Sequence, residues 1–550
     1  MAKKNRPINP IILRPGENIG SASAENDDEF LFDCFLYHPA VIQCSNPRSP
    51  TMILSGRTGA GKTAVIRHLE KQMDHSVLVD PSEMAMNYIS NSDIFRFLDA
   101  IGADLDILFQ SLWKHVLCLE FIRLRFNISD EADSKNVFSR IWNQFSRDKR
   151  KESALEYLKE WEGKFWITMD QNIREIAEKV ESQVEAELSA DIHKFKSRGQ
   201  YHKQLSSEKK TELVARARRI INPDLLIDLN KIIGMLQEVS SDGQFTFFIL
   251  LDKLDENWVT ADVRFKLIRA LIESLKTFRK IHCLKILVAL RSDVLERVVQ
   301  ETEDISFQRE KYEEYFLPLR WQEDQLKKLI QNRIRKLFAR QYTGKDVLFE
   351  DVFTPKIGNK DTFSYLIDRT LMRPRDIISF VNECLKQGSN THEVTVKNVH
   401  QAEKEYSRVR RQALIDEWKS TYPTLDKCID LLAQAGHEVL TISDLLSENR
   451  LEELALAIGA ADKIEYDPLH SVAVKSLEQG DGYSNLAREV ASILYTVGAV
   501  SLKLRPDERH FYSHIDSPVI EPALITEAVK IKVHPMLHAT LNITDKRRTH

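Results

Sequence analysis

The sequence predicts an α/β protein whose core is a parallel sheet of five strands, and three observations support this class. Glycine and proline, which interrupt helices and strands, number only 18 and 17 among 550 residues, so long regular elements are favoured. Short apolar runs rich in β-branched and aromatic residues recur along the chain, as expected of strands buried on both faces. The segment Gly56–Thr63 matches G-x-x-x-x-G-K-S/T, a pattern that joins a strand to a helix in such sheets.

Five segments are the predicted strands of this sheet. Each is short and apolar and ends in polar or charged residues, which is typical of central parallel strands. We place the α/β domain at residues 1–120 and 228–322, because these strands and their connecting helices fall within them. In chain order the strands are Met52–Leu54, Ser76–Val79, Phe245–Leu251, Leu284–Leu290 and Tyr315–Arg320.

The loop that follows the first strand is the strongest functional signal in the chain. Its glycines let successive backbone N–H groups point at phosphate oxygens, and the helix that follows adds the positive end of its dipole. The Lys62 ammonium is expected to reach the β- and γ-phosphates, and the Thr63 hydroxyl to coordinate Mg²⁺. We predict that ATP and Mg²⁺ bind to this P-loop, through Gly56, Arg57, Thr58, Gly59, Ala60, Gly61, Lys62, Thr63 and Ala64.

Three carboxylates follow the third predicted strand, at the sheet edge where ligands bind in doubly wound folds. Asp252 is the predicted partner of Mg²⁺ together with Thr63. Glu256, or alternatively Asp255, is the candidate that orients and deprotonates the attacking water.

Further along the chain, Arg291 ends the fourth strand and Arg373-Pro374-Arg375-Asp376 opens a helix, while Ile19–Phe30 precedes the P-loop. This order of motifs resembles the STAND and origin-recognition-like branch of the AAA+ ATPases, and more narrowly a bacterial P-loop ATPase family. The resemblance implies an ASCE-type core in which Arg291 is the sensor-1 residue. It also implies that Arg375 is the sensor-2 residue on a helical lid, which we place at residues 323–420.

The chain departs from the pattern of that family in its acidic motif. Lys253 stands where the STAND pattern prefers a small residue, and no glutamate directly follows Asp252. The arginine finger of such ATPases has two candidates here, Arg320 and Arg333.

A long helical insert, predicted at residues 121–227, separates the P-loop helix from the acidic strand. Apolar residues at three- and four-residue spacing predict an amphipathic helix or short coiled coil over 173–188. Basic clusters occur at His193–Arg198 and Arg216–Arg219. Two interpretations stay open: an arm that contacts a partner subunit, another protein or nucleic acid, and a helical hairpin that packs on its own ATPase domain.

Residues 421–550 predict a winged-helix-like α+β domain, the usual C-terminal partner of origin-recognition-like ATPases. Helical stretches lead into two alternating segments, Ala499–Leu504 and Arg509–His514, around a polar turn that is typical of a β-hairpin. Such a domain binds DNA through a recognition helix and a wing, here with the helix Asn485–Leu494. Contact with a protein, or an autoinhibitory latch, is an equally open use.

The overall composition restricts the function classes. Lys and Arg total 78 against 82 Asp and Glu, a net charge of −4, which excludes a binder that relies on high positive charge over the whole chain. The six cysteines form no CxxC pair, and no apolar run approaches the length of a membrane span. We therefore expect a cytoplasmic protein without a membrane partner.

These observations together predict an ATP-binding and ATP-hydrolysing molecular switch. Its nucleotide state would control homo-oligomerisation or the binding of a protein effector encoded separately, and the family resemblance adds anti-phage defence as a setting. Two alternatives stay open. One is an origin-recognition-like ATPase that binds double-stranded DNA through the winged helix and the basic insert, and the other is a nucleotide-locked scaffold that does not hydrolyse ATP.

Overall fold

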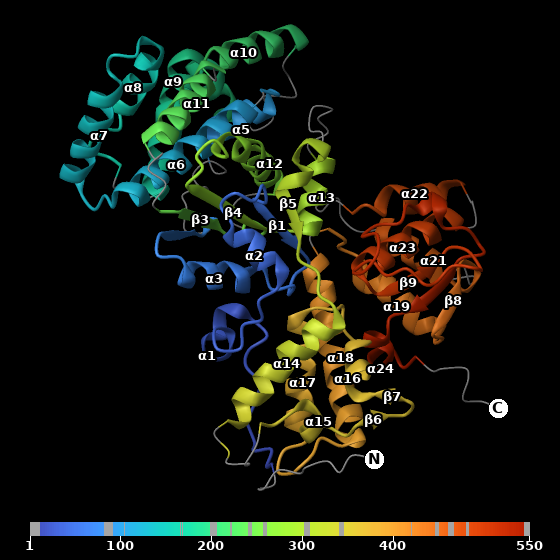
Figure 1. Ribbon diagram of the computed structural model, residues 1–550. Helices are drawn as coiled ribbons and strands as arrows, with labels where there is room; N and C mark the ends of the chain where they lie inside the picture. Colours follow the sequence, from blue (N-terminus) through green and yellow to red (C-terminus); the bar gives the residue numbers. More distant parts are fainter. Residues whose placement is uncertain are drawn as a thin grey trace. The chain divides into compact units, whose positions relative to one another are not determined.

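The computed structural model divides into two compact units (Figure 1). The sheet unit comprises Tyr37–Arg57 and Lys62–Leu319, and the C-terminal unit comprises Met1–Leu36, Thr58–Gly61 and Arg320–His550. The structure describes residues 11–81, 92–103, 105–165, 167, 169–198, 206–220, 223–239, 245–256, 261–301, 309–339, 341, 346–419, 421–445, 450–459, 467–479 and 483–543.

The sheet unit is built on a five-stranded sheet in the order β2-β3-β4-β1-β5, in which all neighbouring strands are parallel. The predicted α/β class and its five parallel strands are therefore confirmed, with strand ends within two residues of the prediction. β3 is buried along its whole length and β4 up to its last residue, which explains why both sequences are almost wholly apolar. The strands are β1 (Ile53–Gly56), β2 (Ser76–Val79), β3 (Phe247–Leu251), β4 (Leu284–Arg291) and β5 (Phe316–Pro318).

Apart from α2 and α3, which contribute no residue to it, the helices described in the sheet unit share one apolar core with the sheet. The predicted insert is part of that core, so it packs on its own α/β domain instead of forming a separate arm. The segment with the amphipathic pattern is part of α9. The predicted insert boundaries, at residues 121 and 227, fall inside α6 and α11. The helices are α2 (Pro39–Ser45), α3 (Lys62–Gln72), α5 (Asp93–Ala100), α6 (Asp106–Phe126), α7 (Glu131–Phe145), α8 (Glu152–Lys159), α9 (Met169–Arg198), α10 (Ser207–Ile220), α11 (Pro223–Val239), α12 (Ala261–Phe278) and α13 (Ser292–Glu301).

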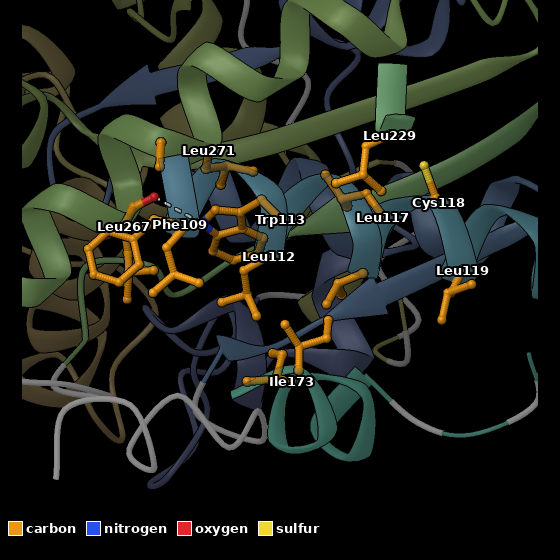
Figure 2. Packing of buried hydrophobic residues seen from close by; sticks show 14 of the residues in the cluster. Phe109, Leu112, Trp113, Leu117, Cys118, Leu119, Ile173, Leu229, Leu267 and Leu271 are labelled. Carbon is orange, nitrogen blue, oxygen red and sulfur yellow. Dashed lines mark hydrogen bonds between the residues drawn. The ribbon is translucent and has the colours of Figure 1, made fainter. Parts of the chain in front are cut away.

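Helix α6 lies at the centre of this core (Figure 2). Its residue Trp113 is fully buried, and the indole N–H donates to the Leu267 carbonyl of α12 at 2.9 Å. Ile173 of α9 and Leu229 of α11 belong to the same cluster. Because α6 is covered on several sides, its sequence is apolar around most of the helix and has no single apolar stripe.

We expect Trp113→Phe to lower the free energy of unfolding by about 2–4 kcal/mol, because it removes one buried hydrogen bond and leaves a cavity in the core. Phenylalanine is smaller than the indole and cannot donate to the Leu267 carbonyl. Urea denaturation followed by circular dichroism measures the change. Trp142→Phe is the same substitution at a half-buried position of α7, and equal losses in both variants would contradict a central role of Trp113 in this core.

The first part of the C-terminal unit is a helical layer with its own apolar core. Residues of the N-terminal segment, among them Ile11, Leu13 and Ile19, are buried in it. A short antiparallel hairpin, β6 (Lys356–Ile357) and β7 (Lys360–Asp361), interrupts the helices. These are α1 (Asp28–Leu31), α14 (Glu323–Phe338), α15 (Phe349–Val352), α16 (Thr362–Ile367), α17 (Pro374–Gln387) and α18 (Val396–Trp418).

The second part of the C-terminal unit is an α+β layer around another apolar core. Its antiparallel sheet has the order β8-β10-β9, formed by β8 (Val439–Thr441), β9 (Val500–Lys503) and β10 (Lys530–Val533). The helices are α19 (Leu425–Ala435), α20 (Ile442–Leu445), α21 (Arg450–Gly459), α22 (His470–Gln479), α23 (Ser484–Val497) and α24 (His538–Leu541).

The β-hairpin predicted within 499–514 is confirmed only in part, because its two segments meet at a single bridge. β9 pairs along its length with β10, and only one antiparallel bridge, between Leu502 and Phe511, joins it to the predicted partner. β9 is an edge strand, so it pairs with β10 along one edge and with Phe511 on the other; Ile531 and Val533 of β10 are completely buried, whereas most of 509–514 stays partly exposed.

Helix α18 runs through both parts of the C-terminal unit. Its first half contributes Val399 and Tyr406 to the core of the helical layer, and its second half contributes Leu414 and Trp418 to the core of the α+β layer. Between them, the Ser407 hydroxyl donates to the Met536 carbonyl at 2.6 Å. The two layers are therefore joined by one continuous helix. None of the helices that the structure describes is both long and apolar enough to cross a membrane.

Candidate functional site

The P-loop connects β1 to α3, as the motif predicts. Gly59 and Gly61 have φ values of 78° and 98°, a left-handed backbone conformation that disfavours side chains. Lys62 is buried at the start of α3, and its ammonium donates to the carbonyls of Gly56 at 3.0 Å and Arg57 at 3.3 Å. The lysine thus lies against the backbone of its own loop.

In the sheet unit, carboxylates from the end of β3 lie near this lysine. Burial lowers the pKa of Lys62, while the negative charges of Asp255 and Asp252 act in the opposite direction. Asp252 is 7% exposed, and this burial raises the pKa of its carboxyl. A hydrogen bond from the Thr63 hydroxyl acts in the opposite direction and lowers the pKa. The structure therefore brings together Lys62, Thr63, Asp252 and Asp255, four of the predicted site residues.

The two candidates for activating water differ in their surroundings. Asp255 is half-buried and lies 3.6 Å from the guanidinium of Arg291, which also makes two bonds to Asp293. The Glu256 side chain is exposed, and its backbone carbonyl accepts a hydrogen bond from Arg264 at 2.9 Å. Asp255 is thus a carboxylate that lies beside both Lys62 and Arg291.

The tip of the P-loop, Thr58–Gly61, belongs to the C-terminal unit, and the helical layer of that unit holds it. The Arg373 guanidinium donates to the Thr58 carbonyl at 2.6 Å, and the Trp321 indole donates to the Ala60 carbonyl at 2.7 Å. Neither contact was predicted, although Arg373 stands two residues before the predicted sensor.

Arg375 lies directly against Gly59. A Cβ atom at Gly59 would stand 2.8 Å from the Cβ of Arg375, so only glycine permits this approach. Burial lowers the pKa of Arg375, and the positive charge of Arg373 adds to the shift. A half-buried cation beside a phosphate-binding loop would be stabilised by an anion.

The two arginine-finger candidates have different environments. Arg333 is 3% exposed, pairs with Asp27 at 2.6 Å and donates to the Ile19 carbonyl at 2.9 Å. It fixes the N-terminal segment, so its interpretation as a finger that reaches another subunit is wrong. Arg320 is exposed and donates to the Ile515 carbonyl at 3.2 Å.

Part of the positive charge on the elements predicted to contact DNA is half-buried or paired. In the predicted recognition helix α23, Val490–Val497 is buried throughout, and Arg488 is half-buried. In the insert, Arg216 pairs with Glu187 and Asp191 at 3.4 and 4.0 Å.

Comparisons with known proteins give three similarities. Residues 324–415 match the FunZ-associated C-terminal helical domain. The chain is 20% identical over 549 residues to a protein described as an 80.3 kDa protein of transposon gamma-delta from Escherichia coli (strain K12), a match that covers 95% of this chain and 67% of that protein. A Walker-type ATPase of Pyrococcus abyssi has a solved structure with 11% sequence identity and a TM-score of 0.37, over 95% of this chain and 98% of the other. The chain is thus similar to the FunZ-associated helical domain over the elements from α14 to α18, which include Arg373 and Arg375.

Proposed function

We propose that the protein binds ATP with Mg²⁺ at the P-loop and hydrolyses it. The observation that carries this proposal is the convergence of Lys62, Thr63 and Asp252 at the edge of a parallel sheet, after a glycine-rich turn. Each group has the chemistry that a nucleotide phosphate and its cation require.

The chain's own groups have separate roles in this proposal. The backbone N–H groups of the loop and the Lys62 ammonium bind phosphate oxygens, and Thr63 with Asp252 would hold Mg²⁺. The cation, when bound, neutralises charge on the β- and γ-phosphates. Asp255 orients the attacking water and accepts its proton, and Arg291 compensates charge beside it.

We further propose that the nucleotide state is transmitted through the helical layer of the C-terminal unit, as in a molecular switch. Arg375 acts as the sensor that contacts the γ-phosphate, and Arg373 holds the loop carbonyl of Thr58. The resulting change would control oligomerisation or the binding of a separate protein effector. The family resemblance alone supports anti-phage defence as its setting.

The chain order α19-β8-α20 to α23-β9-β10, with sheet order β8-β10-β9, supports a winged-helix-like domain. The burial of Val490–Val497 favours a protein contact for this domain over insertion of α23 into the DNA major groove. We therefore place the DNA-coupled ATPase second.

We expect Lys62→Ala to weaken ATP affinity by about 10- to 100-fold and to remove turnover, because a charge-assisted contact contributes about 1.5–3 kcal/mol. Equilibrium binding of fluorescent mant-ATP and steady-state phosphate release measure both effects. Lys71→Ala is the matched control, since Lys71 is exposed on the same helix.

The same phosphate-release assay, run with and without double-stranded DNA, separates the two candidate functions. Turnover that is indifferent to DNA supports the protein-coupled switch. Turnover that rises with DNA and disappears in Lys62→Ala supports the DNA-coupled ATPase. Undiminished ATP affinity in Lys62→Ala would contradict the nucleotide site itself.

A further inference from the structure

We propose that Lys253 is a positioning residue for the acidic edge, and that its ion pair with Asp80 holds it in the required conformation. The inference rests on the proposed Mg²⁺–ATP site. It assigns a role to Lys253, the residue at which this chain departs from the family it resembles. It also assigns a role to Asp80, the partner of Lys253.

The backbone of Lys253 is the first observation. Its φ of 60° lies in the left-handed region, which is sterically disfavoured for a residue with a Cβ atom. In this conformation its N–H donates to Asp252 Oδ1 at 2.9 Å, and its carbonyl accepts from the Glu256 N–H at 3.1 Å. Since the Thr63 hydroxyl also bonds the carboxylate, Asp252 is oriented from two sides.

The side chain of Lys253 is the second observation. Its ammonium lies 2.8 Å from Asp80 Oδ2, and the two side chains are 33% and 16% exposed. Asp80 follows β2, the edge strand that neighbours β3 on the side away from β4 and β1. The Asp252 N–H still bonds the Val79 carbonyl of β2, at 3.3 Å, so the two strands stay joined at this level.

The ion pair therefore has two consequences. It anchors the left-handed conformation from a neighbouring strand, and it keeps the lysine charge paired with Asp80 instead of with Asp252. The hydrogen bond from the Glu256 N–H to the Lys253 carbonyl closes a turn, and in this turn Asp255 lies beside Arg291. Lys253 in this way positions both Asp252, the proposed partner of Mg²⁺, and Asp255, the proposed base.

The test measures how Mg²⁺ strengthens mant-ATP binding at equilibrium, with no turnover required. Lys253→Ala and Asp80→Asn are expected to raise the half-maximal Mg²⁺ concentration by about three- to tenfold, because each removes the anchor of a disfavoured conformation. Lys253→Gly adopts that conformation without a steric penalty, so it should stay within about twofold of the natural protein.

Asp74→Asn is the matched control, because Asp74 is exposed at the opposite end of β2 and undergoes the same change of charge. Binding of mant-ATP in EDTA should be equal in all variants. Absence of mant-ATP binding to the natural protein at saturating Mg²⁺ would contradict the proposed nucleotide site, whereas normal binding at saturating Mg²⁺ with an unchanged half-maximal Mg²⁺ concentration in Lys253→Ala and Asp80→Asn would overturn the positioning role. Equal impairment of Lys253→Gly and Lys253→Ala would also overturn it, since the backbone conformation would then not be the cause.

Discussion

Asp255→Asn is expected to lower the turnover of ATP by about 10²- to 10⁴-fold, the usual contribution of a general base, with ATP affinity unchanged. Asp255 is half-buried, interacts with the charge of Lys62 and lies 3.6 Å from Arg291. Asparagine preserves the size of the side chain but cannot accept the proton of the attacking water. Single-turnover phosphate release, with mant-ATP binding in parallel, separates chemistry from affinity.

Glu256→Gln is the comparison that decides between the two adjacent carboxylates. Because the Glu256 side chain is exposed, we expect its neutralisation to change turnover by less than about tenfold, well below the effect of a general base. The reverse order, with Glu256→Gln inactive and Asp255→Asn active, would show that the turn after Lys253 rearranges when ATP binds.

Asp376→Asn is expected to destabilise the C-terminal unit by about 3–5 kcal/mol, the range found when one partner of a buried ion pair is removed. Asp376 is completely buried between Arg373 at 2.9 Å and Arg410 at 2.7 Å, and it also accepts from the Leu371 N–H. Burial alone would raise the pKa of this carboxyl, but the two guanidinium groups outweigh it and hold the pKa far below its usual range. Asparagine would leave Arg410 buried without this carboxylate.

Calorimetric unfolding at neutral pH measures the loss. The control is Glu405→Gln on α18, because Glu405 and Arg408 form an exposed pair with the same spacing, and no measurable change is expected. Since folding depresses the pKa of Asp376, its stabilising contribution is complete above the ordinary value of 3.8 and decreases as the pH falls below it. The difference between the natural protein and Asp376→Asn should therefore narrow in acid.

The elements that the sequence predicts well are those with a local signal. β3 and β4 are apolar because they are buried on both faces, and the turn Gly56–Thr63 has a pattern that few other structures require. The meeting of Thr63 with Asp252 follows from the parallel arrangement of β1 and β3, which places both strand ends at one edge. Fold class and the cluster around the P-loop could thus be predicted without coordinates.

The features that escaped prediction depend on contacts between distant segments. β9 pairs with β10, far along the chain, because Ile531 and Val533 are more completely buried than the nearer candidate strand. The pairing of Lys253 with Asp80 depends on the position of β2 beside β3, which the sequence of neither strand encodes. Arg333 is one of two candidate fingers in the sequence because its partner Asp27 lies 306 residues away in the chain.

The continuity of α18 has a mechanical consequence. A helix of 23 residues is about 35 Å long, and this one carries Glu417, which pairs with Arg373 of the P-loop contact at 3.1 Å, near one end. Its middle is fastened to the α+β layer through Ser407. A tilt of a few degrees about Glu417 would displace Ser407, ten residues or about 15 Å along the helix, by about 1 Å. Because Leu414 and Trp418 at the same end of α18 lie in the core of the α+β layer, a movement of Arg373 that shifts Glu417 would act on that layer directly.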